Sequence, residues 1–452
     1  MVLTPFYLLV LYFFAKRYRN KHYGYNHPLR KYYLPGLLAK FAGVIFIALV
    51  YQYYYHGGDT FNYFVHARTI NSALDESFST WFDVLLRRSP EVNPMVYRYS
   101  SQMYWYIDQS AYAVSRIGAL LGLLNGTTYI PIGLLMAYFT YTGIWAMYRT
   151  FVKIYPRLYK QLAWAFLFIP STVVWGSSLF KDSICMFGLG WLTTTVFRIF
   201  VDRNFTLKNI ALMVLSFYLL AVIKVYIIMA FLPALSLWLL LTYSNRIKNI
   251  GVRIFSILLF IGILAGGFLF IANSFAKELD EYAIDNIAHK AKKTQTWINY
   301  VSDIQDGSAY NIGTLDGTLP NMLSKFPQSV NVTLYRPYLW EARKPIIFLS
   351  AVEASLFLIL TLMVFYRIGF KKTFGNIIKD PNLLFFLCFT IIFAFAIGIS
   401  TGNFGTLSRY KIPCLPFFAA LLLILYYQAK TQLPVTQKAL HAKKPVTNFA
   451  RL

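Results

Sequence analysis

Apolar segments close to 20 residues long recur throughout the chain, and this repeated length constrains the fold more than any other feature. A helix needs about 20 apolar residues to cross a bilayer. Hydrophobic residues make up 57% of the 452 positions and charged residues only 13%, which excludes a disordered chain and disfavours a soluble domain. The sequence therefore predicts an all-α, polytopic membrane protein with about eleven transmembrane helices. The predicted spans are 3–15, 33–53, 127–149, 160–178, 184–201, 207–223, 226–242, 251–274, 344–366, 381–400 and 411–428.

The net charge of +25 is distributed as expected for a membrane topology. Six segments that flank the spans hold 25 of the 43 Lys and Arg residues but only two acids, Asp202 and Asp380. These segments are 16–32, 149–160, 198–208, 243–253, 367–380 and 429–452. Because they alternate along the chain, the excess follows the positive-inside rule, and a nucleic-acid partner is not indicated. We expect an inner (cytoplasmic) membrane protein with its N-terminus outside and its C-terminus in the cytoplasm.

This topology leaves two large loops on the outer face, 56–126 and 275–343. Within them, 60–74, 77–88 and 275–300 place apolar residues at helical spacing, which predicts amphipathic helices. The helices of the first loop are expected to lie on the membrane surface.

A further apolar stretch, 110–124, is interrupted by Arg116 and is expected to be re-entrant or interfacial. A span there would invert every later loop and break the charge pattern. The expected parts of the chain are 1–55 (N-terminal transmembrane helices), 56–126 (first outer loop), 127–274 (a six-helix transmembrane block), 275–343 (second outer loop), 344–428 (C-terminal transmembrane helices) and 429–452 (a disordered basic tail).

The first outer loop opens with an acidic residue that follows two glycines, in the order His56-Gly57-Gly58-Asp59. Nearby cations would keep Asp59 ionised, so that it acts as general base towards a sugar hydroxyl. The structural alternative is an aspartate that caps a helix or lies in a loop.

Two neighbours of Asp59, Asn62 and His66, are candidate substrate-binding residues. No cofactor is indicated with certainty. A divalent metal held by Asp59 with His56 and His66 is an option, although three groups in an irregular loop are a weak signal.

Other charged and aromatic residues, far apart in sequence, are predicted on the same outer side. Ionisable groups at a bilayer cost several kcal/mol unless they pair or face a cavity, so we expect them to line one outward-opening cavity. A surplus of basic groups there suits a phosphate or pyrophosphate whose lipid tail stays in the membrane. The remaining candidate substrate-binding residues are Lys181, Asp182, Lys224, Tyr226, Arg336, Tyr338, Trp340, Glu341, Glu353, Arg409 and Lys411.

Structural alternatives exist for these residues too. Lys181 and Asp182 could simply pair with each other, and Lys224, Arg336 and Arg409 could be interfacial side chains that extend towards water.

Glu353, inside a predicted helix, could form a structural hydrogen bond to a neighbouring helix. Trp175, Tyr338 and Trp340 could stack on sugar faces, whereas most aromatic residues are expected in the interfacial belt and the core. No Gly-rich nucleotide loop is present, which disfavours a cytoplasmic enzyme that uses ATP or a sugar nucleotide.

In four places the chain resembles the polytopic GT-C-type glycosyltransferases and the related bacterial O-antigen and exopolysaccharide polymerases. These are Gly58-Asp59 at the start of the first outer loop, the amphipathic helices of that loop, Arg336-Pro337-Tyr338 with Trp340-Glu341 before a late helix, and Arg409-Tyr410-Lys411-Ile412-Pro413 entering the last helix. The resemblance implies that Asp59 is catalytic, that the donor is a polyprenyl phosphate or pyrophosphate sugar, and that the outer loops bind the acceptor. The chain differs from GT-C enzymes in the extra helix before the span that leads to Asp59.

Three hypotheses follow. The leading one is a glycosyltransferase or polymerase that moves sugar from a polyprenyl-linked donor to a saccharide or lipid-linked acceptor, among membrane lipids, on the outer face. The main rival is a transporter or flippase for a lipid-linked saccharide, although no internal repeat typical of transporters is found. The third is an assembly subunit that docks a partner through 275–343.

Overall fold

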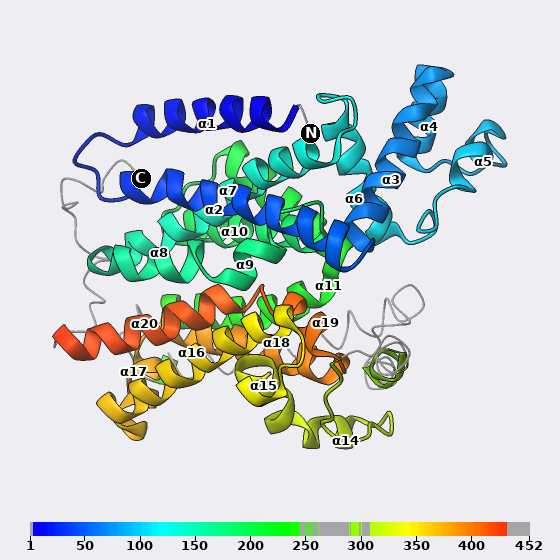
Figure 1. Ribbon diagram of the computed structural model, residues 1–452. Helices are drawn as coiled ribbons and strands as arrows, with labels where there is room; N and C mark the ends of the chain where they lie inside the picture. The colour runs from blue at the N-terminus through cyan, green and yellow to red at the C-terminus, as the bar shows by residue number, and fades with distance from the viewer. Residues whose placement is uncertain are drawn as a thin grey trace. The chain divides into compact units, whose positions relative to one another are not determined.

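The computed structural model describes residues 3–244 and 308–431 and, between them, positions 249, 251, 252, 255, 262, 289, 291–297 and 300. Regular structure in these parts of the chain is helical, apart from one isolated bridge between Ala309 and Asn403. The chain divides into two compact units, built on Met1–Val225 and Tyr226–His441. Figure 1 shows the helices of each unit.

The helices of the first unit, with the first part of α11, are α1 (Leu3–His22), α2 (Arg30–Leu49), the π-helical turn η1 (Val50–Tyr54), α3 (Asp59–Ser72), α4 (Phe78–Leu86), α5 (Met95–Ser100), α6 (Gln109–Gly122), α7 (Tyr129–Ile154), α8 (Tyr159–Leu167), α9 (Pro170–Trp175), α10 (Lys181–Val196), the π-helical turn η4 (Phe197–Val201) and α11 (Leu207–Ser244). The second unit contains the remainder of α11. Its other helices are α14 (Leu319–Ser324), α15 (Phe326–Tyr335), the short η6 (Leu339–Glu341), α16 (Pro345–Ile368), α17 (Phe370–Lys379), α18 (Pro381–Ser400), α19 (Phe404–Tyr410) and α20 (Leu415–Thr431).

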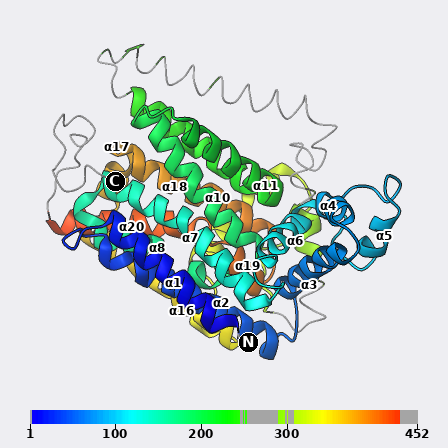
Figure 2. The same cartoon turned by 90° about the horizontal axis from the view of Figure 1, so that it is seen from above.

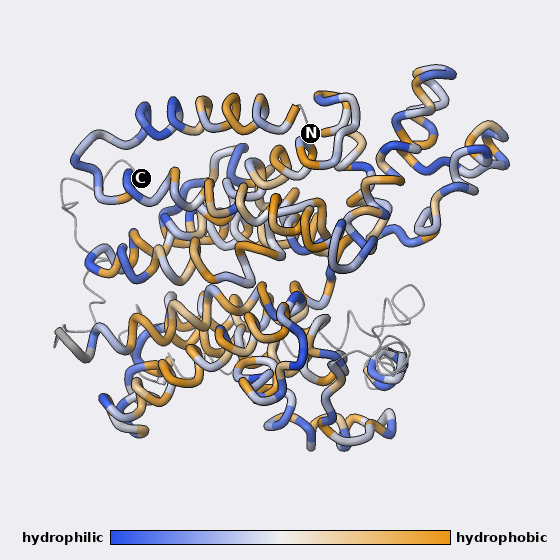
Figure 3. Tube along the Cα trace, in the orientation of Figure 1, coloured by the Kyte–Doolittle hydropathy of each residue, from blue (hydrophilic) through white to orange (hydrophobic). Residues whose placement is uncertain are grey.

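Six of the helices in the described residues are long and apolar enough to cross a membrane, and a seventh crossing is counted if the bent pair α19 and α20 forms one span. The six are Arg30–Tyr54, Tyr129–Ile154, Lys181–Val201, Leu207–Ser244, Pro345–Ile368 and Pro381–Ser400. Hydrophobic residues run along these helices and hydrophilic residues gather in the links (Figure 3). The prediction of an all-α, multi-pass membrane protein is confirmed, whereas the count of eleven spans is not.

Glycine backbones hold the centre of the first unit together. A Cβ atom on Gly143 of α7 would lie 2.4 Å from the carbonyl oxygen of Phe187, and one on Gly190 of α10 would lie 2.2 Å from the carbonyl oxygen of Gly143. The two backbones are therefore in direct contact, as small residues allow between membrane helices. α7 also contacts α1, α2 and α8, and the helices α1, α2, α7 and α10 run side by side (Figures 1 and 2).

One predicted span, 160–178, is broken in the structure. α8 ends at Leu167 and α9 begins at Pro170, because proline lacks a backbone N–H and disfavours a helical conformation in the residue before it. The buried ammonium group of Lys40, on α2, donates a hydrogen bond to the carbonyl of Gly176, just after α9. This bond helps to satisfy the backbone where the helix stops.

Other predicted spans differ in their limits. The predicted helix 411–428 begins at Leu415, and α19 precedes it at an angle of 70°. α1 extends beyond 3–15 to His22 and is not one of the six candidate spans. The two predicted spans 207–223 and 226–242 both fall within α11, which is interrupted at Lys224 (φ −149°, ψ 76°) and is counted as one candidate span. The predicted span 251–274 and most of the predicted helix 275–300 lie outside the described residues.

The helices predicted at 60–74 and 77–88 are present as α3 and α4, and of the two only α4 has its apolar residues concentrated on one face. They share a hydrophobic cluster with α5 and α6 that includes Ile70, Trp81, Val96 and Tyr112. α6 covers 14 residues, fewer than the number of about 20 that a span requires. α3 to α6 lie beyond one end of α2 and α7 (Figures 1 and 2).

Candidate functional site

The turn before Asp59 has a conformation that depends on glycine. Backbone φ is positive at three consecutive residues, 54° at His56, 140° at Gly57 and 121° at Gly58, and α3 begins at Asp59. A Cβ atom on Gly58 would lie 2.9 Å from the ring of Tyr51. The half-exposed Asp59 is thereby fixed at the N-terminal end of a helix, where the helix dipole favours its negative charge. This position is compatible with the helix-end alternative as well as with a catalytic role.

The ring of Tyr51 connects this turn to the start of α10. Its centroid lies 6.4 Å from that of Phe61, on the first turn of α3, and 5.6 Å from that of Phe180. Phe180 directly precedes Lys181, the first residue of α10. Packing on one buried aromatic ring thus brings the N-terminal ends of α3 and α10 together, and Lys181 interacts electrostatically with Asp59.

Lys181 also contacts a third helix terminus. Its ammonium nitrogen lies 2.6 Å from Ser110 Oγ and 3.3 Å from Asp108 Oδ2. Asp108 caps α6, because its Oδ1 atom accepts hydrogen bonds from the backbone N–H groups of Ser110 and Ala111. Burial raises the pKa of Asp108, but the hydrogen bond from Ser110 and the charge of Lys181 outweigh it and bring that pKa below its ordinary value.

Asp108 is part of the site and is absent from the residues predicted from the sequence. The signal that indicates it is the order Asp108-Gln109-Ser110 immediately before the apolar run 111–124, which is typical of a helix N-cap.

Asp182 forms a buried ion pair with Lys224. The nitrogen of Lys224 lies 2.5 Å from Asp182 Oδ1, and the two side chains are 6% and 0% exposed. Lys224 occupies the break in α11, so the break places its side chain at the start of α10. The alternative in which Lys181 and Asp182 pair with each other is wrong, since each has a different partner.

The cluster formed by Asp59, Asp108, Lys181, Asp182 and Lys224 is called the helix-end charge cluster below. It has three carboxylates and two ammonium groups, so the expected surplus of basic groups is not found in it.

The other two predicted residues of α3 differ in exposure. Asn62 is exposed, whereas His66 is 3% exposed and its ring lies 5.8 Å from that of Trp105. Burial lowers the pKa of His66, and its Nδ1 atom has no hydrogen-bond partner among the residues that the structure describes. Across the described residues, no three His, Cys, Asp or Glu side chains are grouped as metal ligands would be.

In the second unit, Glu341 organises the loop before α16. Its carboxylate accepts hydrogen bonds from Arg336 Nε, at 3.1 and 3.0 Å, and from the backbone N–H of Tyr338, at 2.8 Å. Burial raises the pKa of Glu341, but these hydrogen bonds and the charge of Arg336 outweigh it, so the pKa lies below its ordinary value. The predicted residues Arg336, Tyr338 and Glu341 are therefore brought together.

Lys411 and Glu353 lie deeper in the same unit. Lys411 is fully buried, donates a hydrogen bond of 3.3 Å to the backbone carbonyl of Arg336 and interacts electrostatically with Glu353. Arg409 is partly exposed on α19. Tyr226 packs beside Phe393, with ring centroids 6.0 Å apart.

The three aromatic residues proposed to stack on sugars have different environments. Trp340 is 80% exposed and stacks on Tyr338, with ring centroids 4.8 Å apart and planes at 23°. Trp175 is only 7% exposed and packs near Phe180, so the expectation that its face is available to a sugar is wrong.

The predicted site residues therefore form two sets, one in each unit. The first set comprises Asp59, Asn62, His66, Lys181, Asp182 and Lys224, and the second comprises Tyr226, Arg336, Tyr338, Trp340, Glu341, Glu353, Arg409 and Lys411. Their convergence in one cavity stays a prediction.

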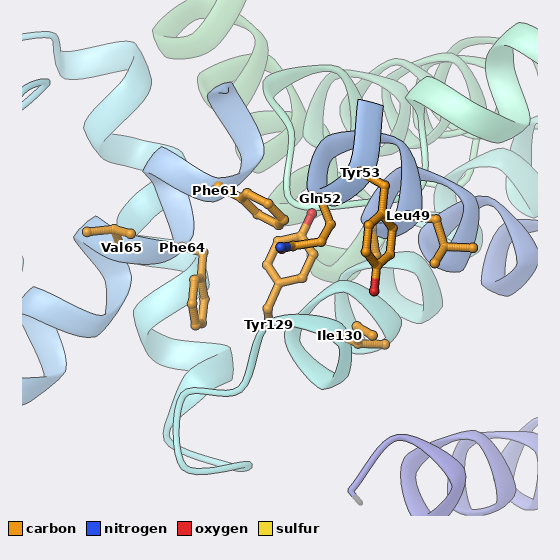
Figure 4. Close-up of a pocket in the computed structure, with 9 residues that line it drawn as sticks. Leu49, Gln52, Tyr53, Phe61, Phe64, Val65, Tyr129 and Ile130 are labelled. Atoms are coloured by element: carbon orange, nitrogen blue, oxygen red, sulfur yellow. The ribbon is translucent and has the colours of Figure 1, made fainter. Parts of the chain in front are cut away.

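An apolar groove of about 430 Å³ lies in the first unit, close in sequence to Asp59 (Figure 4). Its lining comes from α2 with η1 (Ala48, Leu49, Gln52, Tyr53), from α3 (Phe61, Phe64, Val65) and from the start of α7 (Tyr129, Ile130). The hydroxyl group of Tyr129 lies 2.9 Å from Thr60 Oγ1, which connects α7 to the residue after Asp59. Figure 4 shows the rings of Phe61, Tyr129 and Tyr53 around the groove.

No protein-family model, no curated protein and no solved structure matches the chain. A function has therefore to rest on the geometry of its own residues.

Proposed function

We propose that the protein is an integral membrane glycosyltransferase that moves sugar from a polyprenyl phosphate or pyrophosphate carrier to an acceptor on the outer face of the cytoplasmic membrane. The observation that carries this proposal is the position of Asp59. It is accessible at a helix terminus, interacts with Lys181 and lies two residues before Phe61, which lines the apolar groove.

In this mechanism Asp59 accepts the proton of the acceptor hydroxyl group while the oxygen attacks the anomeric carbon of the donor sugar. The bond between that carbon and the phosphate oxygen breaks, and the phosphate leaves with the bonding electrons. Lys181, whose side chain is 19% exposed, and the N-terminal N–H groups of α3 and α10 would stabilise the charge of the departing phosphate.

The apolar groove fits the lipid part of such a donor. Its volume of about 430 Å³ is within the range of about 300–1,000 Å³ found for small-molecule sites. One wall belongs to Arg30–Tyr54, a candidate span, so a prenyl chain in the bilayer would reach the groove without crossing water. In the second unit, the ring of Trp340, which is 80% exposed and stacks on Tyr338, offers a face for a sugar ring.

A specific observation also favours the rival function, a transporter or flippase for a lipid-linked saccharide. α11 is interrupted at Lys224, and the interruption carries a buried ion pair with Asp182. Interrupted helices with buried charges are typical of transporter binding sites.

The test uses purified protein in liposomes, a synthetic polyprenyl-phosphate sugar and a soluble acceptor, with product measured by mass spectrometry. Asp59→Asn should lower the rate by about 10²–10⁴-fold, the usual contribution of a general base, with unchanged thermal unfolding. Asp75→Asn, at an exposed aspartate in the turn just after α3, is the matched control. Full activity of Asp59→Asn would contradict the assigned role. Movement of lipid-linked sugar across the bilayer without product would favour the transporter.

A further inference from the structure

A basic pocket lies in the link between α1 and α2, separate from the helix-end charge cluster. Its volume is about 360 Å³. Its lining residues are Arg19, Tyr25, Asn26, His27, Pro28, Arg30 and Lys31. Three of them carry a positive charge and none is a carboxylate. Arg30 begins α2, whose other end leads through η1 to the turn before Asp59.

Two guanidinium groups converge in this pocket on a single oxygen atom. Arg19 donates to Asn20 Oδ1 through Nη2 at 2.9 Å, and Arg30 donates to the same atom through its own Nη2 at 2.8 Å. Two like charges this close repel each other, and the repulsion grows as the surroundings become less polar. Neither arginine forms an ion pair with a carboxylate in the described part of the chain, so the pocket lacks a compensating negative charge.

Other contacts hold the basic side chains in place. The second guanidinium nitrogen of Arg30 donates to the carbonyl of Tyr23 at 2.5 Å, and its carbon lies 4.4 Å from the centre of the Tyr25 ring. The ammonium group of Lys31 lies 5.2 Å from the centre of the Tyr32 ring. The N-terminal end of α2 adds the positive end of a helix dipole. The pocket is thus preorganised for an anion.

We propose that this pocket binds a phosphate group, and that the phosphate belongs to the headgroup of an anionic membrane lipid. Arginine binds phosphate oxygens through paired N–H donors, and two arginines offer such donors here. Arg30 is the first residue of the candidate span Arg30–Tyr54, so if that helix crosses a bilayer the pocket would lie at its end, near the level of lipid phosphates. Basic pockets at the ends of membrane helices on the cytoplasmic side suit such headgroups. This site is independent of the proposed transferase activity.

The test compares two double variants of the full-length protein in phosphatidylcholine nanodiscs to which phosphatidylglycerol is added. Arg19→Gln with Arg30→Gln removes two pocket charges. Arg17→Gln with Lys21→Gln removes two exposed charges from the same end of α1 and is the matched control for general surface electrostatics.

Retained phosphatidylglycerol is measured by native mass spectrometry, and the lipid-induced shift in melting temperature is measured in parallel. We expect the pocket pair to weaken phosphatidylglycerol binding at least about tenfold more than the control pair does. Equal weakening by both pairs would overturn the proposal.

A second arm distinguishes the source of the phosphate. Inorganic phosphate is titrated into discs of pure phosphatidylcholine. Binding of inorganic phosphate that depends on the pocket, with no preference for phosphatidylglycerol, would overturn the lipid assignment. If the glutamine pair fails to fold, Lys31→Gln replaces it, because Lys31 also lines the pocket and its ammonium group lies over the rings of Tyr32 and Tyr159. Unchanged phosphatidylglycerol binding by that variant would then overturn the proposal.

Discussion

Lys224 and Asp182 form an ion pair of 2.5 Å from which solvent is almost completely excluded. The lysine occupies the only non-helical position within α11, and the aspartate lies in the first turn of α10. Because an unpaired charge is very costly in such surroundings, each residue requires the other. The pair therefore fixes the break in α11 against the N-terminal end of α10, next to Lys181.

Removing either partner of this pair should be strongly destabilising. We expect Lys224→Met and Asp182→Leu each to lower the free energy of unfolding by about 3–5 kcal/mol, because each leaves one buried charge unpaired. The double variant should lose much less than the sum, since no charge is left. Reversible unfolding in mixed detergent measures all three. Additive losses would show that the two side chains do not depend on each other.

Gly58 should tolerate no side chain. Its φ of 121° is open to glycine alone, and an added methyl group would meet the Tyr51 ring. We expect Gly58→Ala to cost about 1–3 kcal/mol and to lower transfer activity by moving Asp59. Gly375→Ala, at an unobstructed position within α17, should be neutral or slightly stabilising. A thermal melt and the transfer assay separate the two variants, and wild-type behaviour of Gly58→Ala would refute the strain argument.

Asp108 combines two roles that two substitutions can separate. Asparagine is as good an N-cap as aspartate, so Asp108→Asn should keep α6 stable and remove only the charge beside Lys181. Asp108→Ala should cost about 1 kcal/mol in addition, because it also removes the cap. Stability is measured by thermal unfolding. Equal losses from the two substitutions would show that the cap contributes nothing.

Trp175 and Trp340 should respond in opposite ways to replacement by alanine. Trp175 is 7% exposed, so Trp175→Ala should cost about 3–5 kcal/mol through the cavity left behind. Trp340 is 80% exposed, so Trp340→Ala should leave the melting temperature unchanged and raise the KM for a saccharide acceptor. An unchanged KM would remove the stacked pair Tyr338–Trp340 from the proposed acceptor site.

His66 should make stability depend on pH. Burial lowers its folded-state pKa below the unfolded value of about 6.5, so the unfolded chain binds the proton more readily. The contribution of His66 is therefore complete above that value and is lost as pH falls towards the folded pKa. Melting temperatures at about pH 7.5 and about pH 5.5 should differ more in the wild type than in His66→Gln. His27, whose pKa is also lowered by burial, should retain part of the dependence in both.

Hydrophobic segment length was sufficient to predict the membrane fold class, and the helical spacing of apolar residues was sufficient to predict helices at the positions of α3 and α4. It failed where proline and local polar contacts interrupt an apolar run, as at Pro170, because hydropathy does not register a missing backbone N–H. The start of α20 at Leu415 was missed for a related reason, since Lys411 lies fully buried among apolar residues in the link before it.

The alternation of basic segments predicted Asp59, Lys181, Asp182 and Lys224 on one side of the membrane. The structure brings these four residues together in the first unit. The pairing itself was beyond sequence reasoning. Adjacent residues such as Lys181 and Asp182 point in different directions from a helix, so each meets a different partner. The apolar groove was also missed, because Phe61 and Phe64 have the spacing of a membrane-facing surface whether or not a third helix closes over them.

The contact between Gly143 and Gly190 limits how this chain can diverge. A methyl group at either position would push α7 and α10 apart, and α10 carries both Lys181 and Asp182 at its first turn. A substitution at Gly190 would thus displace Lys181 and Asp182, which lie about two and a half turns before it on α10.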